Sequence, residues 1–97
     1  MAVEKITNGT EAVLKVSGWL DTQSSPELEK AVAELDGNTE TLVFDFEKLE
    51  YISSAGLRQI VAAHKKMNGK LTLRNVQSDI MSVLSMAGFD KRLHIEA

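Results

Sequence analysis

The chain has 97 residues, 43% of them apolar, with one proline, no cysteine and a formal net charge of −3. This length predicts one domain spanning residues 1–97, and the lack of cysteine excludes a disulfide framework, a thiol nucleophile and a thiolate metal site. The acidic balance without a basic stripe argues against nucleic acid as a partner. With no secretory signal and no apolar run near the roughly 20 residues needed to span a bilayer, we expect a cytoplasmic location without membrane insertion.

The first elements expected are two strands over residues 2–7 and 11–17. Asn8-Gly9-Thr10 separates them, and Asn-Gly between two short apolar stretches is a strong hairpin signal. A helix follows, with Ser25 as N-cap and proline at its first position. Ser24-x-x-Glu27 also fits a capping box, so the helix start stays open by one residue. Gly37 is expected to end this helix, whose apolar stripe comprises Leu28, Ala31, Val32 and Leu35.

The second half of the chain continues the alternation. Residues 40–46 contain the run Leu42-Val43-Phe44, which predicts a central strand covered on both faces. A second helix with an apolar face then precedes a half-buried strand around residues 70–74. A third helix ends at Gly88 with a Schellman cap, and a short last strand follows. The apolar face of the second helix is assigned to Leu57, Ile60, Val61 and Met67, that of the third to Ile80, Val83 and Leu84, and the last strand to Leu93 and Ile95.

The expected order is therefore β-β-α-β-α-β-α-β, an α/β fold. Each strand–helix–strand unit favours a right-handed crossover and a parallel neighbour. The result is a mixed sheet, mostly parallel with an antiparallel first strand, packed with helices. These patterns leave open whether the helices cover one face of the sheet or both.

Two segments fall where sites gather in such sheets, outside the carboxyl ends of parallel strands. One is Gly18-Trp19-Leu20-Asp21, after the second strand; the other is residues 51–57, which lead into the second helix. If the two strands are neighbours, Asp21 and Ser54 lie on the same rim. Ser53 and Ser54 have an ordinary structural interpretation as N-caps. Two successive serines followed by Ala55-Gly56, however, leave one hydroxyl free and approachable.

The stretch from Asp45 to Leu57 resembles the signature of STAS domains in bacterial anti-sigma factor antagonists. Gly18-Trp19-Leu20-Asp21 is similar to the family's Gly-x-Leu-Asp, and Gly88-Phe89 to its ending of the third helix. These matches occur in the right order along the whole chain. The resemblance implies a STAS fold and a phosphoacceptor serine two places before the glycine, which is Ser54.

The chain departs from the family pattern at Ser53, where an aspartate is usual, so phosphorylation at Ser53 stays open. The resemblance further implies a partner-switching phosphoprotein in transcription regulation. Its unphosphorylated form binds an anti-sigma factor that is a serine kinase and so releases a sigma factor. Phosphorylation reverses this exchange, and a serine phosphatase is a further expected partner. Many antagonists also carry a C-terminal helix beyond the last strand of this chain.

The residues assigned to partner binding are those around the two segments: Trp19, Asp21, Ser53, Ser54, Ala55 and Gly56. Asp21 is equally well explained as a cap or turn residue, and Trp19 as an exposed anchor or as packing for the first helix. Tyr51 is expected to fill the gap below the serine loop.

The main alternative is another STAS role, as a scaffold subunit of a lipid-transport ABC complex or of a stressosome-type assembly. An enzyme is not expected, because a serine hydrolase needs a base beside its nucleophile and the G-x-S-x-G elbow is missing. His64 lies about 15 Å along the helix from Ser54, and His94 is on the last strand. With no clustered ligands and no phosphate-binding glycine motif, no metal or cofactor is expected.

Overall fold

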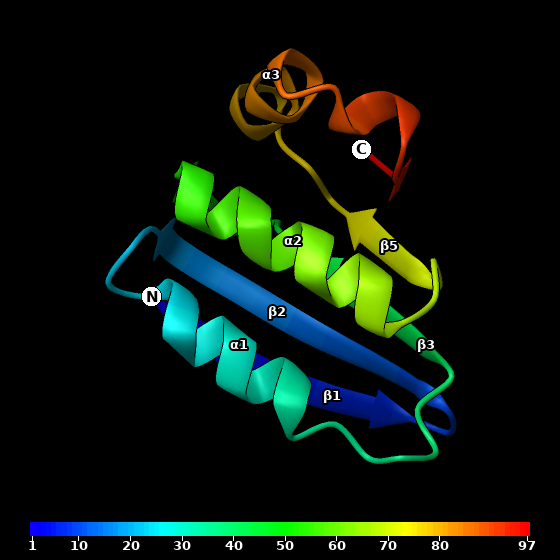
Figure 1. Cartoon of the computed structure of the whole chain (residues 1–97). Helices are drawn as coiled ribbons and strands as arrows, with labels where there is room; N and C mark the ends of the chain where they lie inside the picture. Colours follow the sequence, from blue (N-terminus) through cyan, green and yellow to red (C-terminus); the bar gives the residue numbers. More distant parts are fainter.

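The chain begins with the β-hairpin that Asn8-Gly9 predicts. Strand β1 (Ala2–Asn8) pairs antiparallel with β2 (Glu11–Leu20), and Gly9 has a φ of +65° in the two-residue turn. The structure is a computed structural model and describes residues 1–97, the whole chain. In Figure 1 the hairpin forms one side of the sheet.

The remaining strands run parallel to β2 or to one another. They are β3 (Thr41–Asp45), β4 (Leu49–Ile52), β5 (Leu71–Arg74) and β6 (His94–Ile95). The strand order is β1-β2-β3-β5-β6, with β4 paired to β2 beyond the stretch that β3 occupies. The α/β fold class and the mixed, mostly parallel sheet with an antiparallel first strand are confirmed.

Strand β4 is the element that sequence analysis missed. Its burial runs buried, exposed, exposed, buried, without the alternation that identifies a strand. It forms because β2 does not stop at residue 17 but continues to Leu20, through an irregularity in register between Gly18 and Trp19. Gly18, Trp19 and Leu20 therefore belong to a strand and not to the loop after it.

Three helices connect the strands: α1 (Ser25–Ala33), α2 (Ser54–Lys66) and α3 (Ser78–Met86), with a short 3₁₀ helix, η1 (Phe89–Lys91), after α3. Helix α1 ends at Ala33, before the expected stop at Gly37. Helix α3 ends before Gly88 as predicted: Gly88 has a φ of +80° and its N–H donates to the Ser85 carbonyl at 3.0 Å. The second hydrogen bond of the predicted Schellman cap, from the Phe89 N–H to the Leu84 carbonyl, is not formed. None of the helices combines the length and the apolar composition of a membrane-spanning segment.

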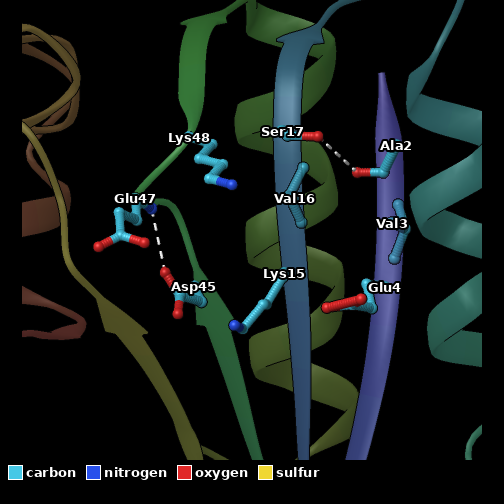
Figure 2. A pocket seen from close by; sticks show the side chains of 9 residues that line it. All are labelled: Ala2, Val3, Glu4, Lys15, Val16, Ser17, Asp45, Glu47 and Lys48. Carbon is cyan, nitrogen blue, oxygen red and sulfur yellow. Dashed lines mark hydrogen bonds between the residues drawn. The ribbon is translucent and has the colours of Figure 1, made fainter.

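Helices α1 and α2 cover one face of the sheet, whereas α3 lies beyond β5 at the edge of the sheet (Figure 1). Figure 1 shows α1 and α2 side by side in front of the strands, and Figure 2 views the sheet from the opposite side, with helices behind it. Cross-strand neighbours Leu14, Phe44 and Leu73 are fully buried toward the helices. The next residue on each strand, Lys15, Asp45 and Arg74, lies on the other face, because side chains alternate along a strand.

Candidate functional site

The two segments singled out in the sequence meet at one end of the sheet. Leu20, the last residue of β2, pairs with Ile52, the last residue of β4. The Ser53 N–H donates to the Leu20 carbonyl at 2.9 Å, which continues this pairing past the ends of both strands. The structure therefore brings Asp21 and the serine pair to the same rim, where Figure 1 shows the tip of β2 near the first turn of α2.

Ser53 and Ser54 occupy different positions on helix α2. Ser53 is the N-cap, with extended backbone, and its hydroxyl accepts a hydrogen bond from the Gly56 N–H at 3.4 Å. Ser54 is the first residue of the helix; its side chain is exposed and makes no hydrogen bond to another residue. Because Ser53 provides the cap, the Ser54 hydroxyl is accessible.

Asp21 closes the turn that leads into helix α1. Its Oδ1 accepts hydrogen bonds from the N–H groups of Gln23 and Ser24, both at 3.0 Å. The Ser24 hydroxyl is 2.7 Å from the Trp19 carbonyl and accepts from the Asp21 N–H at 2.9 Å. Ser24 is the N-cap of α1 but makes no side-chain cap bond, because its hydroxyl is used in this turn.

These hydrogen bonds set the acidity of Asp21. Donation from the Ser24 backbone N–H, reinforced by its hydroxyl, lowers the pKa of the Asp21 carboxyl below its ordinary value. Partial desolvation acts in the opposite direction with a smaller effect. The carboxylate therefore stays ionised at neutral pH, as a negative charge on the same rim as Ser54.

Trp19 and Tyr51 form an exposed aromatic pair beside this rim. They are cross-strand neighbours on β2 and β4, with ring centroids 4.9 Å apart and an interplanar angle of 39°. Trp19 is 57% exposed and Tyr51 44% exposed. The expectation that Tyr51 fills a gap below the serine loop is wrong: it packs against Trp19 on the surface. The sequence could not indicate this pair, because the pairing depends on β4.

Ala55 and Gly56 lie beneath the rim and not on it. Both are buried. A Cβ added at Gly56 would come within 2.7 Å of Ile52 Cγ1 and 2.8 Å of Leu20 Cγ. The glycine thus allows α2 to approach the ends of β2 and β4, which corrects the expectation that both residues contact a partner directly.

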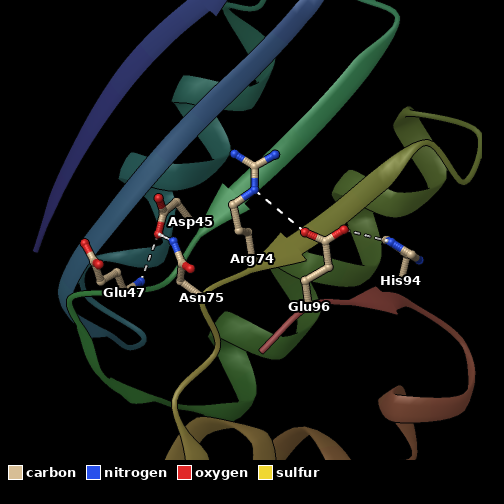
Figure 3. Close-up of polar contacts among 6 residues, drawn as sticks. All are labelled: Asp45, Glu47, Arg74, Asn75, His94 and Glu96. Atoms are coloured by element: carbon tan, nitrogen blue, oxygen red, sulfur yellow. Dashed lines mark hydrogen bonds and ion pairs between the residues drawn. The ribbon is translucent and has the colours of Figure 1, made fainter.

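The buried carboxylate of Asp45 holds the β3–β4 turn, which precedes β4 and the two serines. Asp45 is 8% exposed, and its Oδ1 accepts from the Glu47 N–H at 3.0 Å and from Asn75 Nδ2 at 3.2 Å (Figure 3). The Gln77 side-chain amide donates to the Glu47 carbonyl. These bonds tie the β3–β4 turn to the chain that follows β5, so the first residue of the family signature has a positioning role.

Other polar features lie away from the serine rim. A cavity of about 290 Å³ on the open face of the sheet is lined by residues of β1 and β2, among them Glu4 and Lys15, by Asp45 at the end of β3, and by residues of the β3–β4 turn (Figure 2). It includes none of Trp19, Tyr51, Ser53 or Ser54. His94 contacts Glu96 at 3.2 Å (Figure 3), and His64 is in the last turn of α2. No three His, Asp or Glu side chains are grouped closely enough to hold a metal ion.

Comparison with known proteins gives a consistent result. The chain is 29% identical over 93 residues to a putative anti-sigma factor antagonist, BtrV, of Bordetella bronchiseptica, covering 92% of this chain and 78% of that protein. Its fold is similar to an anti-sigma factor antagonist from Mycobacterium paratuberculosis, with a TM-score of 0.88 and 21% identity over 98% of this chain and 84% of that one.

A further similar structure is SpoIIAA, described as a Bacillus cell fate determinant. Its unphosphorylated form has a TM-score of 0.72, with 97% of this chain and 86% of that chain covered. Its phosphorylated form has a TM-score of 0.67, with 99% and 92% covered; both forms are 18% identical to this chain. The STAS domain model matches residues 2–97. With this match over nearly its whole length, the chain belongs to the STAS domain family.

Proposed function

We propose that this protein is an anti-sigma factor antagonist controlled by phosphorylation of Ser54. In the unphosphorylated form it binds an anti-sigma factor that is a serine kinase, and the anti-sigma factor then releases its sigma factor. Phosphorylation of Ser54 ends this binding, and a serine phosphatase restores it. The proposal rests chiefly on the exposed, unbonded Ser54 hydroxyl at the start of α2.

The choice of Ser54 over Ser53 follows from the capping geometry. Phosphorylating Ser53 would modify the hydroxyl that accepts the Gly56 N–H, whereas the Ser54 hydroxyl can be modified without loss of a hydrogen bond. The names of BtrV and of the Mycobacterium protein support an antagonist role, and the two forms of SpoIIAA support control by phosphorylation. Such a kinase uses ATP, so we place the reaction in the cytoplasm.

The partner-binding surface is proposed to combine Ser54 with Trp19, Tyr51 and Asp21. Tryptophan and tyrosine are enriched among residues that dominate binding energy, and this pair is already packed, so little side-chain entropy is lost on docking. Gly56 acts beneath this surface, by allowing α2 to approach β2 and β4, and Ala55 is buried next to it.

The inhibitory effect of phosphate should arise at the interface and not from unfolding. A phosphoserine carries about −1.5 to −2 charges at neutral pH. At the first residue of a helix this charge is favourable, because the free N–H groups and the helix dipole attract anions. Binding is then prevented by the volume and charge of the phosphate where the partner has to approach.

The test compares Ser54→Ala with the matched variant Ser53→Ala. Each is used to capture partners from the native host, and the captured kinase is then incubated with the wild-type protein and ATP. We expect phosphate on Ser54 by tandem mass spectrometry, persistent capture of the kinase by Ser54→Ala, and much weaker binding by Ser54→Asp. Phosphate on Ser53 alone, or capture of a transporter ATPase in place of a kinase, would refute the proposal.

A further inference from the structure

Arg58 is the charged side chain closest in sequence to Ser54 on helix α2, and it has no ionic partner. It lies one turn after Ser54 and is exposed. The two ion pairs of the structure are Arg74–Glu96 and His94–Glu96, so no carboxylate approaches Arg58 within 4.0 Å. The first turn of α2 contains no acidic residue. A permanent positive charge four residues after Ser54 is thus left without an ionic partner.

The spacing of Ser54 and Arg58 places the two side chains on the same face of the helix. Residues four apart are neighbours on a helix surface, and helical side chains lean toward the N-terminus. This geometry allows the Arg58 guanidinium to reach the turn that Ser54 begins. Asp21, the acidic group at this rim, already accepts hydrogen bonds from Gln23 and Ser24.

We propose that Arg58 binds the phosphoryl group of phosphorylated Ser54 within the same helix, so that the off state is held by an intramolecular ion pair. This inference rests on the proposed function for the identity of the modified residue. A guanidinium presents paired N–H donors that match phosphate oxygens, and such charge-assisted bonds are stronger than neutral ones. In the unphosphorylated protein Arg58 forms no ion pair, so binding the phosphoryl group breaks no existing one.

The expected consequence is that the phosphate is fixed over the first turn of α2 and is less available to other cations. Its second ionisation, ordinarily near a pKa of about 6, should be favoured by Arg58. Phosphorylation should also stabilise the folded domain, because the ion pair forms only when α2 is helical.

The experiment installs phosphoserine at position 54 during translation, so that no kinase is required. The pKa of the phosphate is followed by ³¹P NMR in the full chain, with arginine at position 58 and in Arg58→Gln. We expect this pKa to be about 0.5 higher in Arg58→Gln than with arginine present, and Arg58→Lys to recover part of the difference. Lys65→Gln, which removes the same charge in the last turn of α2, is the matched control and should leave the pKa unchanged.

Urea unfolding of the same proteins, with and without phosphate, gives an independent result. The quantity compared is the factor by which phosphorylation raises the folding equilibrium constant. This factor should be on the order of fivefold larger with arginine at position 58 than in Arg58→Gln. The two unphosphorylated proteins should differ little in stability. Equal phosphate pKa values and equal stabilisation in both backgrounds would overturn the role of Arg58. Failure of the host kinase to modify Ser54 would instead refute the proposed function. The measurements on Arg58 do not depend on that kinase, so the two failures can be distinguished.

Discussion

Ser53 and Ser54 have the same side chain in different surroundings, and the difference arises from one step along the chain. Ser53 has the extended backbone of an N-cap and directs its oxygen to the Gly56 N–H. Ser54 has entered the helix, and its hydroxyl projects outward without a partner. At the scale of single residues, Ser53 caps helix α2 and the Ser54 hydroxyl next to it is free to react.

The two serines should therefore respond differently to truncation. Ser53→Ala removes the cap and is expected to lower the free energy of unfolding by about 0.5–1 kcal/mol. Ser54→Ala removes no hydrogen bond and should change it by less than about 0.5 kcal/mol. Urea denaturation of both variants provides the measurement, and a larger loss for Ser54→Ala would contradict this division of roles.

Asp21 predicts a pH dependence of stability. Because its pKa is lowered in the folded protein, its ionised form stabilises the fold above its unfolded-state pKa of about 3.9, and this contribution is lost as the pH falls through the lower folded value. Asp21→Asn should therefore be less stable than wild type at pH 7, with a difference that narrows between about pH 5 and pH 3. Thermal melts over this range test the point; a difference independent of pH would exclude the charge as the cause.

At the scale of elements, the site depends on how closely α2 approaches the ends of two strands. The buried residues of α2 are Ala55, Gly56, Ile60 and Ala63, and Met67, the C-cap residue, is also buried. Val61, which periodicity placed on the buried face, is 37% exposed, and Ala63 takes the buried position. Small residues at Gly56 and Ala63 allow the helix to lie close to β4 and to α1.

Gly56→Ala should accordingly destabilise the domain, although alanine is normally the better helix former. The new Cβ would meet Ile52 Cγ1, Leu20 Cγ and the Leu20 carbonyl at 2.7–3.0 Å, and such overpacking costs about 1–3 kcal/mol. Gly37→Ala is the matched control, because a Cβ there meets nothing within 4 Å. Chemical denaturation should show a loss for Gly56→Ala alone; equal stability of the two variants would refute the close approach.

At the scale of the whole molecule, one core between the sheet and the helices supports the fold, and the other sheet face carries charged side chains. A domain of this size has a stability of about 5–10 kcal/mol. Phe44 lies on the central strand β3, is fully buried and packs against Phe46 with ring centroids 5.9 Å apart. The core is thus concentrated around a few large side chains.

Phe44→Ala is expected to cost about 3–5 kcal/mol, a large part of the total stability. Ile6→Ala, on the edge strand β1 where the side chain is 41% exposed, should cost about 1 kcal/mol or less. Two-state urea transitions followed by circular dichroism give both values. Similar losses for the two variants would show that the edge strand is as well packed as the core.

The sequence by itself determined the features that depend on local chemistry. Asn8-Gly9 specified the hairpin, the helical periodicity around Leu28 and Ile80 specified α1 and α3, and Gly88 specified where α3 ends. The family resemblance also identified the serine segment. These signals lie within a few residues of the structure they predict, because backbone conformation and capping are decided by near neighbours.

The tertiary structure alone decided the features that join distant parts of the chain. Strand β4 forms only because β2 extends to Leu20, so that residues 18–20 of β2 are available to pair with it. This pairing places Tyr51 against Trp19 and buries Gly56 beneath the rim. The physical reason is that strand pairing and close packing depend on the surface that a segment contacts in the folded protein. The four residues of β4 show no alternation of buried and exposed positions, so their sequence does not predict that contact.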